Sequence, residues 1–301
     1  INKKYTAESV TKTVDLSLLY EVVYTADISI EKAVNLIYST GVVEYAEPVY
    51  IPQLNYTPND SFISSQNFLS IIKAYQAWDL NKGDTNVIIG MIDTGVDWDH
   101  PDIAGNIKIN YSDPINGTDD DSDGYIDNYR GWDFGNGDND PMVEGTAIHG
   151  SATSGCAAAV TDNGIGVASP SFKCKLLPIK VVNTGGLLIG AYDGIKYAVD
   201  RGAQIINCSF GSPFPSQYQR DIVKYATDLG ALIVASAGNG NADLTSSDSY
   251  PCSYDSVYCV ANTNNNDTKY LSSNYGADVD ICAPGVGIYS TYYNYDTAAY
   301  D

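Results

Sequence analysis

Short apolar runs alternate with amphipathic segments along most of the chain, and this pattern predicts its fold class. Continuous apolar runs, typical of buried strands, occupy residues 87–93, 176–182, 203–210 and 231–238. Apolar stripes with helical spacing follow at 186–200 and 216–230, and a helix rich in Ala and Gly follows His149. Strands that alternate with helices predict an α/β protein, with a mainly parallel sheet flanked by helices on both faces.

The first 55 residues have a different pattern. Residues 16–25 predict a strand, Ser29 is a good N-cap for a helix that ends near Gly41, and residues 42–52 predict a second strand. A β-α-β unit of this size is too small to be stable alone, so it is expected to dock on another part of the chain. Turn-forming residues at 56–72 predict a linker.

Composition restricts the classes of partner. The chain has 301 residues, 44% of them hydrophobic, which is enough for one large domain and a small one. Its net charge of -21 makes nucleic acid an unfavourable partner, because phosphates would be repelled. No apolar run approaches the roughly 20 residues that span a bilayer. Glycosylation motifs are typical of an exported protein and begin at Asn55, Asn59, Asn110, Asn116 and Asn266.

Three polar residues near strand ends or a helix start carry the candidate chemistry. Asp93 ends an apolar run, where a carboxylate can orient a histidine and stabilise its imidazolium form. His149 lies among small residues that leave its ring accessible, and the amide of Asn239 can donate to an oxyanion. Asp-Thr-Gly at 93–95 also fits an aspartic protease, but that chemistry needs a second such motif, which only a homodimer would supply. A lone histidine and Asn239 alone are more often structural, and Asp93 alone could be a turn residue; the three together are far more specific.

The segments around these residues resemble the subtilisin family of serine proteases, most closely its thermitase-like members. The resemblance covers residues 56–301 and is carried by VIIGMIDTGVDWDHPDIAGNI, HGSATSGCAAAVTDNGIGVAS, IINCSFGS, VASAGNGN and ICAPGVGIYSTY. It implies a subtilisin-like fold and a secreted, monomeric serine endopeptidase that acts on proteins and peptides. Asp93 would orient His149, His149 would act as general base and then general acid, and Asn239 would stabilise the oxyanion.

The same resemblance implies where substrate binds. The segments 209–211 and 236–238 would form walls of the primary specificity pocket, and residues 185–186 would bind substrate residues further upstream. These substrate-binding residues would be Gly185, Gly186, Ser209, Phe210, Gly211, Ser236, Ala237 and Gly238. Because none of them is acidic, we expect a preference for apolar or aromatic residues before the cut.

The nucleophile motif of the family is not found in these 301 residues. The family places Gly-Thr-Ser-Met-Ala soon after the segment that matches ICAPG, whereas residues 283–301 read APGVGIYSTYYNYDTAAYD. By family spacing, Gly-Thr-Ser would begin at about the next residue. Without a serine nucleophile the 301 residues are expected to be inactive. The alternative is a pseudoprotease or fragment that binds peptides without cutting them.

Residues 16–55 resemble the later half of a subtilisin propeptide, so residues 1–55 would form a partial propeptide with a ferredoxin-like α+β fold. The resemblance implies an intramolecular chaperone and inhibitor, with self-cleavage near Asn55–Tyr56, and a peptidase domain over 56–301. The protein would then be made as a zymogen.

Three calcium sites are expected. Family resemblance implies one formed by the side chains of Asp60, Asp102 and Asn163 and the carbonyls of Val160, Ile165 and Val167. It implies a second at Asp133, Asp138 and Asp140. The third follows the first half of an EF-hand loop, with Asp119, Asp121, Asp123 and Asp127. Arg130 replaces the glutamate that an EF-hand needs, so the third segment is either another type of calcium loop or a solvated acidic loop.

Overall fold

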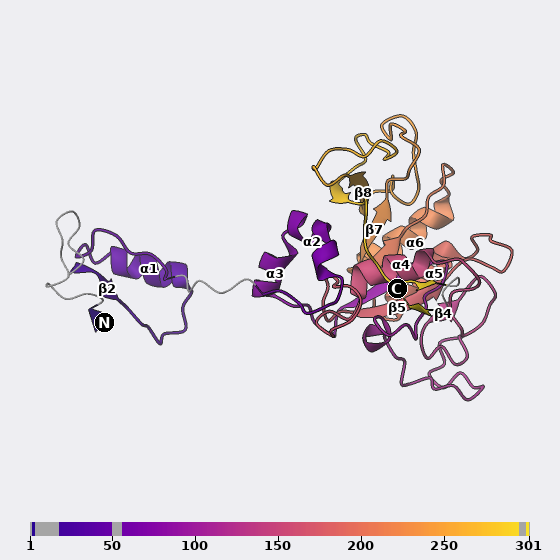
Figure 1. Ribbon diagram of the computed structural model, residues 1–301, viewed down its shortest axis with the longest axis horizontal. Coiled ribbons are helices and arrows are strands. Elements are labelled where there is room, and N and C mark those ends of the chain that lie inside the picture. Colours follow the sequence, from indigo (N-terminus) through magenta and orange to yellow (C-terminus); the bar gives the residue numbers. More distant parts are fainter. Residues whose placement is uncertain (1, 4–17, 50–55, 295–298, 301) are drawn as a thin grey trace. The chain divides into compact units, whose positions relative to one another are not determined.

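The computed structural model describes residues 2–3, 18–49, 56–294 and 299–300, and the chain divides into two compact units, 1–54 and 55–301. In the first unit, Figure 1 shows the helix α1 (Ile30–Tyr38). It begins after Ser29, whose Oγ accepts a hydrogen bond from Lys32 N at 3.3 Å. The predicted helix and its cap are therefore confirmed.

The two strands predicted around this helix are largely wrong. The first is reduced to β2 (Tyr20–Glu21), which pairs antiparallel with β1 (Asn2–Lys3). The described part of the second, residues 42–49, contains no strand, and Val42 is 84% exposed. A strand needs a neighbouring edge for its backbone hydrogen bonds, and no described segment pairs with residues 42–49.

In the second unit, seven strands form one sheet in the order β4-β5-β3-β6-β7-β8-β9, and every pair is parallel. The predicted α/β class is confirmed. The strands are β3 (Ile88–Asp93), β4 (Trp132–Asp133), β5 (Lys175–Lys180), β6 (Ile205–Cys208), β7 (Leu232–Ser236), β8 (Val257–Thr263) and β9 (Ile281–Pro284). A separate hairpin pairs β10 (Tyr293–Asn294) with β11 (Ala299–Tyr300).

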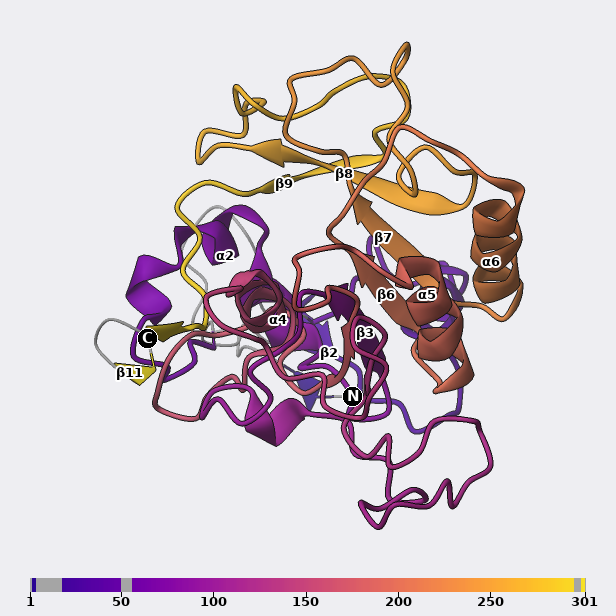
Figure 2. The same ribbon diagram turned by 90° about the vertical axis from the view of Figure 1, so that its right-hand side faces the viewer.

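Helices cover both faces of this sheet. Figure 2 shows α4 (His149–Ala158) on one side and α5 (Ala191–Asp200) with α6 (Gln217–Asp228) on the other. Alternate residues of β3 enter different cores: Met91 packs with Ala158, and Ile92 packs with Ile195. A Cβ on Gly90 would lie 2.9 Å from Ala198 Cβ, so glycine is needed for α5 to pack this closely.

Two local predictions are wrong. The helix predicted over 186–200 begins only at Ala191, because Gly190 has φ +69° and Val182 bridges to Leu188 in a turn. The predicted linker at 56–72 instead forms η3 (Ile63–Ser65) and α2 (Asn67–Ile71), followed by α3 (Ala74–Leu80). Leu69 of α2 is fully buried in a core with Trp78 and Phe172, which stabilises structure in a segment rich in turn formers.

Two further features complete the fold. Cys252 and Cys259 form a disulfide that closes the loop before β8. Within the described ranges, no helix combines the length and the apolar character needed to cross a membrane.

Candidate active site

The carboxylate of Asp93 and the imidazole of His149 are in direct contact. Asp93 is the last residue of β3 and His149 the first of α4, and His149 Nδ1 lies 2.6 Å from Asp93 Oδ1. The Asp93 side chain is 3% exposed, whereas that of His149 is 55% exposed. A Cβ on Gly150 would lie 2.0 Å from Gly95 O, so the small residue after the histidine lets α4 approach β3.

Two further donors fix the Asp93 carboxylate. Thr94 N donates to Oδ1 at 2.7 Å, and Thr153 Oγ1 donates to Oδ2 at 3.0 Å. Sequence reasoning did not single out Thr153. Its spacing of four residues from His149 was the available signal, because residues i and i+4 share a helix face.

Asp93 makes His149 a stronger base. Its carboxylate accepts a hydrogen bond from the imidazole and raises the pKa of His149, which outweighs the opposing effect of burial. Among the described residues, His149 Nε2 has no hydrogen-bond partner, so it is available to a nucleophile. At pH values below 6.5, the ordinary pKa of histidine, the ion pair between the His149 imidazolium and Asp93 stabilises the fold. This contribution is lost as the pH rises through the raised pKa of His149.

The substrate-binding candidates follow adjacent strands at the same edge of the sheet. Ile92 pairs with Cys208, and Cys208 pairs with Ala235, so the carboxyl ends of β3, β6 and β7 lie side by side. The segments 209–211 and 236–238 therefore lie at the same edge of the sheet as Asp93, the first after the strand adjacent to β3 and the second one strand further away. Asn239 is exposed, with no hydrogen bond to its side chain among the described residues. Gly185 and Gly186 form a turn closed by a bond from Gly186 N to Asn183 O.

The structure brings the side chains of the first expected metal site together, and its two carboxylates are buried. Asp60 is 2% and Asp102 1% exposed, and Asn163 Nδ2 donates to Asp102 Oδ1 at 2.7 Å. Burial raises the pKa of both carboxyls, that of Asp102 to about 6, and the charge of Asp60 adds to the effect on Asp102. No basic side chain in the described part of the chain forms an ion pair with either carboxylate.

The loops that would supply the carbonyl ligands lie beside these carboxylates. Val160 N donates to Asp102 O at 2.8 Å, and Val167 N donates to Asp102 Oδ2 at 2.8 Å. Ile165 N donates to Asn163 Oδ1 at 2.9 Å. Oxygen-rich, negatively charged surroundings fit calcium.

At the second expected metal site, Asp133 and Asp138 form an antiparallel bridge, but Asp133 also pairs with a protein cation. Asp133 is buried and its Oδ2 lies 2.8 Å from Lys180 Nζ, which also contacts Glu144 Oε1 at 2.5 Å. Asp138 accepts a bond from Asp140 N, and Asp140 accepts one from Trp98 Nε1. A protein ammonium therefore neutralises Asp133 where the resemblance implied calcium.

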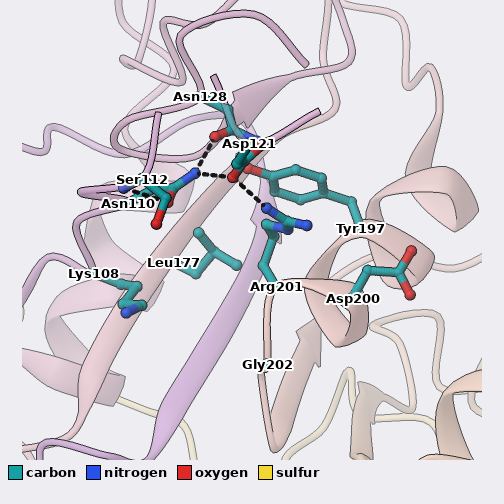
Figure 3. Close-up of a pocket in the computed structure, with 10 residues that line it drawn as sticks. All are labelled: Lys108, Asn110, Ser112, Asp121, Asn128, Leu177, Tyr197, Asp200, Arg201 and Gly202. Carbon is teal, nitrogen blue, oxygen red and sulfur yellow. Dashed lines mark hydrogen bonds and ion pairs between the residues drawn. The ribbon is translucent and has the colours of Figure 1, made fainter. Parts of the chain in front are cut away.

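The third expected metal site also has a protein cation. Arg201 pairs with Asp121 at 3.1 Å and Asp123 at 2.6 Å, and Figure 3 shows Asp121 between Arg201 and Asn110 in a pocket of about 410 Å³. Asp127 accepts bonds from the backbone at 116–117. Among the described residues, one set of three acidic groups lies close enough to hold an ion: Asp113, Asp119 and Asp121. Sequence reasoning missed Asp113, which is fully buried.

Comparison with known proteins identifies the family of this chain. The model of the subtilase family matches residues 84–301. The chain belongs to this family. It is 37% identical to thermitase of Thermoactinomyces vulgaris over 79% of this chain and 76% of thermitase. It is 34% identical to a thermophilic serine proteinase of Bacillus sp. strain AK1, covering 87% of this chain and 60% of that protein.

Solved structures of this family share the fold. A protease from Pseudoalteromonas arctica PAMC 21717 matches with a TM-score of 0.61 and 28% identity, over 76% of this chain and 73% of that one. A psychrophilic subtilisin-like protease from Pseudoalteromonas sp. AS-11 matches with a TM-score of 0.54 and 26% identity, over 73% and 45%.

Proposed function

We propose that the protein is a serine endopeptidase that hydrolyses peptide bonds of proteins, and that residues 56–301 supply the acid–base half of its active site. The contact between His149 Nδ1 and Asp93 Oδ1 carries this proposal. His149 Nε2 takes the proton of the serine hydroxyl, Asp93 stabilises the imidazolium that forms, and Asn239 donates to the oxyanion. The serine itself is proposed to lie in sequence that follows Asp301.

A fluorophosphonate probe, which labels activated serines, tests this assignment. We expect the 301-residue chain to stay unlabelled and to leave casein intact. The same chain extended through a downstream Gly-Thr-Ser should be labelled, and the change His149→Ala should abolish that labelling because the general base is lost. Labelling of the 301-residue chain would contradict the proposed position of the nucleophile.

The alternative function is peptide binding without cleavage. It is favoured by one observation: the proposed peptide-binding segments at 185–186, 209–211 and 236–238 all lie within this chain. If the gene encodes no Gly-Thr-Ser downstream, this pseudoprotease function replaces the first.

The first unit is proposed to act as an inhibitor and chaperone of the second, which makes the protein a zymogen. The boundary between the compact units at Leu54 supports this role, because it adjoins the expected cleavage site. Export is supported by two relatives whose names describe extracellular proteases, from Natrialba magadii and Dichelobacter nodosus. We propose that the mature protein is a secreted monomer.

Calcium is proposed to bind at Asp60, Asp102 and Asn163, where no described residue supplies a cation of the kind that Lys180 and Arg201 provide at the other two sites. A bound ion would offset the repulsion between the buried carboxylates. Their raised pKa values mean that ionisation destabilises the metal-free fold as the pH rises from 3.8 toward about 6.

Removing calcium at pH 7 is expected to lower the melting temperature by on the order of 5 °C. In excess EDTA, the chain should be more stable at pH 5 than at pH 7, whereas saturating calcium should reverse that order. Calorimetry with and without EDTA measures both effects. Asp102→Asn should abolish the response to calcium, and Asp138→Asn, at the second expected site, should leave it intact. An unchanged melt in EDTA contradicts the calcium proposal.

A further inference from the structure

The pocket between the two proposed walls contains a carboxylate. This cavity of about 230 Å³ lies between Gly211 and Gly238, which belong to the two segments assigned to the primary specificity pocket. Its lining also includes Ser247, Asp248 and Ser249, from a loop that sequence reasoning did not connect with substrate. The segments assigned from the resemblance contain no acidic residue, but this additional loop brings one, Asp248, to the pocket.

Backbone pairing brings this loop to the pocket. Ser212 N donates to Tyr250 O at 3.0 Å, and Tyr250 N donates to Ser212 O at 2.8 Å, as in an antiparallel bridge. The side chain of Ser249 then lies against the wall, since a Cβ on Gly211 would be 2.7 Å from Ser249 Oγ. Asp248 is thus held close to the wall by residues 212 and 250.

One oxygen of Asp248 is anchored and the other is free to bind a ligand. Tyr250 is 5% exposed, and its hydroxyl donates to Asp248 Oδ2 at 2.5 Å. This bond, with Asp248 as its acceptor, is the largest cause that raises the pKa of Tyr250. Among the described residues, Asp248 forms no ion pair with Lys or Arg, and its Oδ1 accepts no hydrogen bond. The carboxylate is oriented but not neutralised.

We propose that Asp248 makes this pocket select peptides with arginine or lysine immediately before the cut. The inference rests on the proposed endopeptidase function and replaces the expected preference for apolar or aromatic residues. Asp248 is exposed to solvent, so a guanidinium or ammonium in the pocket can reach it and form a charge-assisted hydrogen bond with Oδ1, whereas an aromatic side chain offers this carboxylate no such donor. The net charge of -21 also attracts cationic peptides.

Binding of product-like peptides to the 301-residue chain tests this inference without any need for the nucleophile. Two fluorescent peptides, identical except for a C-terminal Arg or Phe, are titrated by anisotropy at low and high salt. We expect the Arg peptide to bind about 10-fold more tightly, as one hydrogen bond to a charged group predicts. Asp248→Asn keeps the shape of the side chain and should remove that preference, while Asp255→Asn, at an exposed site outside the pocket, should preserve it.

The outcomes separate the two proposals. Equal affinity for both peptides, or a preference that survives Asp248→Asn, overturns the role of Asp248 and leaves the peptide-binding cleft standing. Failure of both peptides to bind, both to the full chain and after cleavage between the two units at Leu54 and Asn55 has released the proposed inhibitor, with the protein folded by circular dichroism, overturns the cleft and the inference with it.

Discussion

Replacing Asp93 with Asn is expected to lower the pKa of His149 and to reduce hydrolysis by the serine-bearing protein about 10⁴-fold, the loss found for the corresponding change in a chymotrypsin-type triad. The carboxylate accepts the imidazole bond at 2.6 Å and raises the pKa of His149. An amide provides no negative charge to stabilise the imidazolium, and it can favour the wrong tautomer of the neutral ring.

The pKa of His149 can be measured in the 301-residue chain by NMR, because His100 is the only other histidine. In the active protein, the rise of activity with pH should move to lower pH in the Asn variant, since the base loses its proton more readily. Asp221→Asn, on the exposed side of α6, is the matched control and should change neither quantity. An unaltered His149 titration in the Asp93 variant would exclude Asp93 as the partner of the base.

Lys180→Met is expected to lower the free energy of unfolding by about 3–5 kcal/mol, the range for breaking a buried ion pair. Lys180 is 2% exposed, and its loss leaves the buried Asp133 carboxylate without a cation. Burial lowers the pKa of Lys180, but its bonds to Asp133 and Glu144 outweigh that effect and leave the pKa raised. The ammonium therefore remains charged in the fold.

Chemical denaturation measures this loss. Lys196→Met is the control, because Lys196 forms an exposed pair with Asp200 within α5 and should change stability by less than about 1 kcal/mol. A loss of similar size in both variants would show that Lys180 has no special role. Adding Asp133→Leu to Lys180→Met should recover stability, since it removes the unpaired charge.

The predictions that failed share a physical cause. Residues 42–49 have the composition of a strand, but no described segment offers them an edge with which their backbone can pair. Residues 56–72 are rich in turn formers, yet Leu69 and Phe68 pack against a core that includes Phe172, about a hundred residues later. Local propensity is weak, and tertiary packing decides between alternatives of similar energy.

The sequence by itself determined the parallel α/β sheet and the polar residues at its carboxyl edge, because runs such as 87–93 encode burial locally and parallel strands end at one edge. The tertiary structure alone decided which residues lie next to each charged side chain. Lys180 faces Asp133, Arg201 faces Asp121, and Asp248 lies beside Gly211, at separations of 37 to 80 residues along the chain. These long-range contacts depend on strand order and on the course of long loops, which no local pattern of hydrophobic residues specifies.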